Sequence, residues 1–73
     1  MIEIGAIYER TDIDPREPLA RVQVLQGVAI DVWYLVCDRW DDAHEIGAEE
    51  LLARYRQRTR PLPPYPRLRA LKE

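Results

Sequence analysis

The residue types that most often carry chemistry gather in one short stretch of this 73-residue chain. Cys37 and His44 are its only cysteine and its only histidine, and a thiol beside an imidazole is the minimal pair for nucleophilic catalysis. Such a pair also needs a pocket and a third group that orients the imidazole. Cys37 instead falls in an apolar run with Trp33 and Leu35, where a thiol is inert packing. The sequence therefore predicts no catalytic residue and no enzyme.

Four carboxylates share this stretch, within eight residues: Asp38, Asp41, Asp42 and Glu45. Carboxylates bind hard cations, but this spacing lacks the glycine and the closing glutamate of a calcium loop. Cys37 and His44 add only two of the four ligands that a structural zinc site requires. We therefore expect a solvated acidic loop, without a metal and without a cofactor.

Charge is divided unevenly along the chain. Residues 1–50 hold twelve acidic and four basic residues, a formal charge of −8, whereas residues 51–73 hold seven basic residues and one acidic residue, a formal charge of +6. Arginine and tyrosine anchor protein interfaces, and they also bind phosphates and stack on bases. The acidic body argues against a large nucleic-acid footprint, so we expect a protein partner and keep nucleic acid as the alternative.

The aromatic residues are predicted to divide between core and surface. Trp33 and Tyr34 fall in the strongest apolar run and are expected in the core, whereas Trp40 lies among charged neighbours and is a candidate exposed anchor. The predicted partner-binding residues are Trp40, Arg54, Tyr55, Arg58, Arg60, Tyr65 and Arg67.

The C-terminal segment is rich in proline. Residues 60–66 read Arg-Pro-Leu-Pro-Pro-Tyr-Pro, which matches the R-x-L-P-P-x-P pattern of peptides that SH3 domains bind as polyproline helices. A stiff, proline-rich segment also packs well across the surface of its own domain. Two alternatives follow: the segment straps the acidic body, or it docks on another protein.

Alternating apolar residues predict short strands over residues 2–9, 19–26 and 44–46, with an irregular loop at 11–18 and a hairpin turn at Gln26 and Gly27. The strongest predicted strand runs from residue 28 to 38. Its inner face is expected to hold Val28, Ile30, Val32, Tyr34 and Val36.

A helix is predicted from residue 48 to about residue 58. Gly47 can cap its first turn, which holds Glu49 and Glu50, and arginines occupy its last turns. The face predicted to pack inward holds Ala48, Leu51, Leu52 and Tyr55.

These elements predict a mostly-β fold: a small antiparallel, partly open SH3-like barrel with a C-terminal helix and an extended, proline-rich tail. Residues 1–58 would form the single domain, including the closing helix, and residues 59–73 the basic tail. A lone cysteine is consistent with a reducing compartment. The chain also lacks the roughly 20 apolar residues of a membrane span and the basic start of a signal peptide. We therefore expect a cytoplasmic protein that does not enter a membrane.

Three segments carry a resemblance to a known group. Gly5-Ala6-Ile7-Tyr8, Val22-Gln23-Val24-Leu25 and His44-Glu45-Ile46, the last leading into residues 49–55, follow one another as in the small SH3-like barrel proteins of phages and prophages. The resemblance covers residues 4–56. It implies a non-enzymatic accessory or inhibitor protein that binds a host protein, as anti-CRISPR proteins and other defence inhibitors do.

Overall fold

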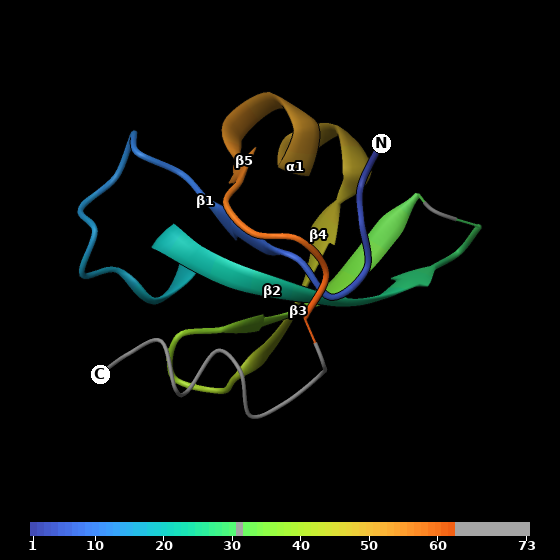
Figure 1. Cartoon of the computed structure of the whole chain (residues 1–73), viewed down its shortest axis with the longest axis horizontal. Coiled ribbons are helices and arrows are strands. Elements are labelled where there is room, and N and C mark those ends of the chain that lie inside the picture. The colour runs from blue at the N-terminus through green and yellow to red at the C-terminus, as the bar shows by residue number, and fades with distance from the viewer. Residues whose placement is uncertain (31, 63–73) are drawn as a thin grey trace.

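A computed structural model describes residues 1–30 and 32–62 of the chain. Five strands form one antiparallel sheet in the order β4-β3-β2-β1-β5, and one α-helix lies over a face of that sheet (Figure 1). The elements are β1 (Ile7–Glu9), the 3₁₀-helix η1 (Pro18–Ala20), β2 (Arg21–Val28), β3 (Trp33–Asp38), β4 (Ala43–Gly47), α1 (Ala48–Arg54) and β5 (Arg56–Gln57). The prediction of a mostly-β fold with one late helix is confirmed. In the described part of the chain, neither helix has the length and apolar content to span a bilayer.

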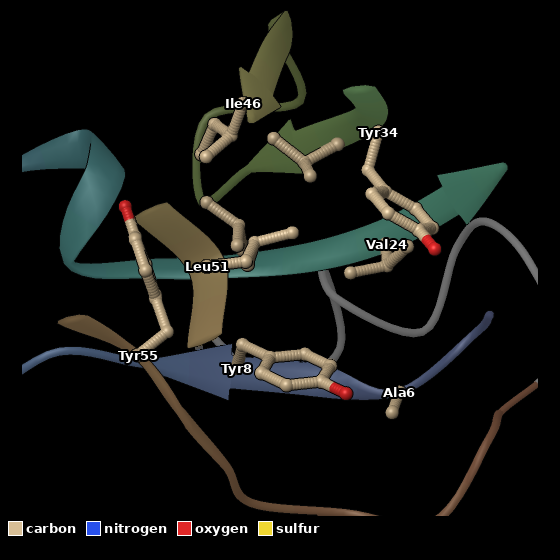
Figure 2. Close-up of a cluster of buried hydrophobic side chains, with 9 residues drawn as sticks. Ala6, Tyr8, Val24, Tyr34, Ile46, Leu51 and Tyr55 are labelled. Carbon is tan, nitrogen blue, oxygen red and sulfur yellow. The ribbon is translucent and has the colours of Figure 1, made fainter. Parts of the chain in front are cut away.

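The core lies between α1 and one face of the sheet, here called the core face. The register sets Tyr8 opposite Val22 and Val24 opposite Val36, and residues directly opposite in an antiparallel pair share a face. Figure 2 shows Leu51 of α1 and Tyr55, the residue that follows the helix, among these sheet side chains. The buried cluster consists of Ala6, Tyr8, Val22, Val24, Tyr34, Val36, Ile46, Leu51 and Tyr55.

The hairpin between β2 and β3 differs from the prediction. The turn falls after Val28, not at Gln26 and Gly27, so the expected strand 28–38 is divided and Val28 ends β2. Ile30 and Val32, expected in the core, are 96% and 57% exposed. Alternation indicates which residues share a face of an extended chain, but it does not indicate where the chain reverses.

The tip of this hairpin is strained. Ala29 and Ile30 both adopt φ of 54°, a left-handed conformation that L-residues avoid and that is least favourable for a β-branched side chain. Replacing Ala29 with asparagine and Ile30 with glycine, the residues preferred where two successive φ values are positive, should raise stability by about 1 kcal/mol. For a domain of this size the melting temperature should rise by roughly 4–8 °C. An unchanged or lower melting temperature would contradict the strained turn.

The helix ends at Arg54, four residues before the predicted end. Tyr55 caps it with its N–H bonded to the Leu51 carbonyl at 3.0 Å, and the chain then extends because Arg56 and Gln57 pair with β1. The start of α1 agrees with the prediction, with Gly47 as N-cap. Leu52 does not pack inward as expected and is 59% exposed.

Residues 58–62 continue alongside β1, past the predicted domain boundary. The Arg58 N–H donates to the Ile7 carbonyl at 2.7 Å, and the Leu62 N–H donates to the Gly5 carbonyl at 2.9 Å. The Gln23 side-chain amide also donates to the Gly5 carbonyl, at 2.9 Å. The chain is thus held against the body as far as Leu62. The rest of the predicted tail, residues 63–73 with Tyr65 and Arg67, lies outside the described residues.

Gly5 is the point of closest approach in this contact. Its φ is +93°, and a Cβ there would lie 2.8 Å from the Leu62 carbonyl oxygen. Gly5→Ala should therefore lower the free energy of unfolding by roughly 1–3 kcal/mol. The matched control is Gly27→Ala, at an exposed position of β2 whose φ is not positive. Equal urea midpoints for the two variants would contradict the close approach.

Candidate protein-binding surface

Two shallow hollows meet at the start of α1. The first, of about 480 Å³, is lined by Val32, Trp33, Gly47, Ala48, Glu49 and Glu50. The second, of about 490 Å³, is lined by Met1, Ile2, Ile4, Tyr34, Ala48 and Leu52. Ala48 belongs to both, and we call the combined surface the apolar groove.

The apolar groove brings together three separate segments of the chain. The first residues run beside α1 (Figure 1), Val32 and Trp33 come from the β2–β3 hairpin, and α1 supplies Ala48 and Leu52. The large exposed side chains in it are Met1, Ile4, Val32, Trp33 and Leu52, each at least 46% exposed. Exposed apolar side chains gathered in this way are typical of interaction surfaces.

Trp33 is the largest of these side chains, and its predicted place in the core is wrong. It begins β3 and pairs with Gly47 of the edge strand β4, and its ring carbons come within 3.7–4.0 Å of the position that a Gly47 Cβ would occupy. The indole thus covers a residue that has no side chain. It remains 46% exposed, because it lies at the end of a strand beside the edge of the sheet.

One side of the groove is acidic. Glu49 and Glu50 lie in the exposed first turn of α1, and the exposed Glu45 precedes Gly47 on β4. Arg10 reaches Glu50 only at 3.9 Å. This carboxylate cluster beside an apolar surface favours a ligand that offers both apolar and basic side chains.

The predicted partner-binding residues come from other parts of the molecule. Trp40 lies in the turn between β3 and β4 and is 56% exposed. Arg54 is exposed at the end of α1, and Arg58 and Arg60 are exposed beside β1. The Arg58 Nε lies 3.4 Å from a carboxylate oxygen of Glu9. None of these residues lines the apolar groove.

Tyr55, predicted at the partner surface, lies in the core. It is 6% exposed, and its hydroxyl donates to the Leu19 carbonyl at 2.7 Å. The guanidinium carbon of Arg10 lies 5.5 Å from its ring centroid. Burial raises the pKa of the hydroxyl, although Arg10 opposes this effect. The ring packs inward because the helix ends at this residue with the ring facing η1.

The acidic stretch is not a simple solvated loop, because Asp38 is buried. It is 1% exposed, and its carboxylate accepts the N–H groups of Trp40 at 2.8 Å and Asp42 at 3.0 Å. Its second oxygen lies 2.7 Å from His44 Nε2. Burial raises the Asp38 pKa, but the hydrogen bonds from Asp42, His44 and Trp40 outweigh it and hold the pKa below its ordinary value. The alternation of residues along β3 indicates this burial, because Asp38 shares a face with Tyr34 and Val36.

This carboxylate holds the β3–β4 turn together, and the Cys37 thiol lies away from it. Cys37 and Val36 lie on opposite faces of β3, and His44 is directly opposite Val36, so the thiol and the imidazole lie on opposite faces of the sheet. Among residues 1–30 and 32–62, no three His, Cys, Asp or Glu side chains are grouped so that they could hold a metal ion.

Comparisons of the chain with protein families, with curated proteins and with solved structures found no match.

Proposed function

We propose that this chain is a non-enzymatic protein-binding module and that the apolar groove is its binding surface. The observation that carries the proposal is the exposure of five large apolar side chains around two adjoining hollows. Solvation of such a surface is unfavourable, and burial contributes roughly 25 cal/mol for each Å² covered. The aromatic Trp33, which lines the first hollow, is a residue type that dominates binding energy in protein interfaces.

We also propose that the chain folds as a partly open SH3-like barrel and that its partner is a host protein. The strand order β4-β3-β2-β1-β5, with α1 between β4 and β5, supports a partly open SH3-like barrel. The resemblance to small barrel proteins of phages and prophages makes a host protein the expected partner. An accessory or inhibitor protein of this kind acts by occupying a surface of its target.

Nucleic-acid binding is the alternative, and the exposed arginines favour it. Arg54, Arg56, Arg58 and Arg60 are all exposed, although Arg58 approaches Glu9. If these side chains neutralised phosphates, binding would weaken with salt with a slope of roughly −0.9 per contact. We expect no shift of single- or double-stranded probes at about 50 mM salt, where such binding is strongest.

The two exposed tryptophans provide a matched test of the proposal. The partner is first isolated by co-purification from the native host, and its affinity is then measured for the wild type, Trp33→Ala and Trp40→Ala. We expect Trp33→Ala to weaken binding about 30-fold, as for a residue that contributes 2 kcal/mol or more, and Trp40→Ala to change it less than about threefold. Unchanged binding by Trp33→Ala would overturn the proposal.

A further inference from the structure

The apolar groove ends at β4, an edge strand of the sheet formed by the described residues. β4 is an outer strand of the sheet and pairs only with β3 among the described elements. The Ala48 N–H donates to the Val32 carbonyl and the Asp38 N–H to the Asp42 carbonyl, which fixes the hydrogen-bonding phase of this regular ladder. In antiparallel pairs, bonded and non-bonded positions alternate. His44 and Ile46 therefore bond to β3, and the N–H and C=O groups of the other three β4 residues point outward: Ala43, Glu45 and Gly47.

The side chains along this edge form a short pattern. On the face opposite the core, Glu45 is followed two residues later by Gly47, whose missing side chain exposes the Trp33 ring. A strand added outside β4 would place one side chain beside Glu45. Its side chain two residues along would reach across Gly47 to the indole. The edge thus combines outward backbone groups, a carboxylate and a half-exposed aromatic ring.

We propose that the partner docks by adding an extended segment to β4 as a new strand, with a lysine or arginine beside Glu45 and an apolar side chain on Trp33. This inference rests on the proposed function and names the chemistry of its ligand. Backbone hydrogen bonds to an exposed edge provide affinity, and the alternate side chains provide specificity. Charge complementarity with Glu45, Glu49 and Glu50 selects the basic residue.

A second copy of this chain fits the edge poorly. In a symmetric antiparallel pairing over the whole of β4, the central Glu45 would lie directly opposite the Glu45 of the other copy, and like charges in that position are destabilising. The same charge protects the edge from self-association, as charged side chains do on other edge strands. A ligand with a basic residue opposite Glu45 avoids this charge repulsion.

The first test selects ligands from random peptides and does not need the partner itself. A random linear peptide library is panned on the immobilised full chain, with Glu45→Lys as the matched panning target. We expect the wild type to enrich peptides with a basic residue two positions from an aromatic or aliphatic residue, and Glu45→Lys to enrich an acidic residue in its place. Failure to enrich such peptides, or enrichment of the same peptides by both targets, would overturn the proposal.

The second test reads the hydrogen bonds directly by amide exchange with the selected peptide. We expect the amides of Ala43, Glu45 and Gly47 to exchange fast in the free chain and at least tenfold more slowly in the complex. Those of His44 and Ile46 are already bonded and should exchange slowly in both. N-methylation of the peptide at alternate positions should abolish binding for one parity and leave the other unchanged. Equal effects of the two parities would overturn strand addition.

The outcomes separate this inference from the proposed function. A peptide that requires Trp33 but leaves exchange at the three outward amides unchanged would keep the apolar groove as the interface and overturn strand addition. If the host partner binds Trp33→Ala as tightly as the wild type, the proposed function itself is overturned. If removal of residues 63–73 speeds exchange at these amides in the free chain, the chain's own end occupies the edge, and the proposal of an external ligand fails.

Discussion

Leu51→Ala will lower the free energy of unfolding by about 2–5 kcal/mol, the cost of truncating a fully buried leucine. Leu51 is 0% exposed and is the residue of α1 that enters the core. Figure 2 shows it pointing into the buried cluster between α1 and the sheet. At roughly 0.05–0.15 kcal/mol per residue, a 73-residue chain has about 4–11 kcal/mol of stability, so the variant should lose a large part of it. Urea titration followed by circular dichroism measures the loss.

The adjacent leucine is the matched control. Leu52 is 59% exposed, so Leu52→Ala should change stability by no more than about 0.5 kcal/mol. Because Leu52 lines the apolar groove, the same variant should weaken partner binding, whereas a folded Leu51 variant should retain it. Equal losses of stability for the two variants would contradict the placement of α1.

Asp38→Ala will lower the free energy of unfolding by roughly 2–4 kcal/mol, because it leaves the N–H groups of Trp40 and Asp42 without their buried acceptor and removes the partner of His44. This cost stays below that for a fully buried ion pair because the His44 side chain is 37% exposed. The control is Asp42→Ala, at an exposed position in the same turn. A loss for Asp38→Ala no larger than that for Asp42→Ala would contradict the buried network.

The contribution of Asp38 should also depend on pH. Its pKa is lowered in the folded protein, so the charged form is favoured by folding. The resulting stability is fully present above the unfolded value, about 3.9, and is lost as pH falls through the folded pKa. The difference in stability between the wild type and Asp38→Asn should therefore narrow as the pH falls below about 4. A difference that grows as the pH falls below about 4 would contradict the lowered pKa.

Local patterns predicted what depends on neighbours in sequence. Alternation placed Val22 and Val24 on one face of a strand, and Gly47 before Glu49 and Glu50 located the start of α1. The face of a strand depends on side chains two residues apart, and the start of the helix depends on its first turn and its dipole. Neither feature depends on which strands pair with each other.

Features that depend on strand pairing were not predictable. Trp33 occupies an apolar run that would be buried in a central strand, but it lies at a strand end over an edge glycine. The apolar groove joins residues 1–4, 32–34 and 47–52, which no spacing in the sequence connects. Alternation along β3 already places Asp38 on the face of Tyr34 and Val36, but its contact with His44 depends on the pairing of β3 with β4.

The central claim is that the apolar groove around Trp33 is the binding surface, and the two indole N–H signals in a ¹H–¹⁵N spectrum test it most directly. The chain has only two tryptophans, Trp33 in the groove and Trp40 outside it. No substitution is needed, so no folding defect can interfere. On titration with the purified host partner, we predict that the Trp33 indole signal shifts or broadens and that the Trp40 signal stays in place. A shift of the Trp40 signal with the Trp33 signal unchanged would contradict the account.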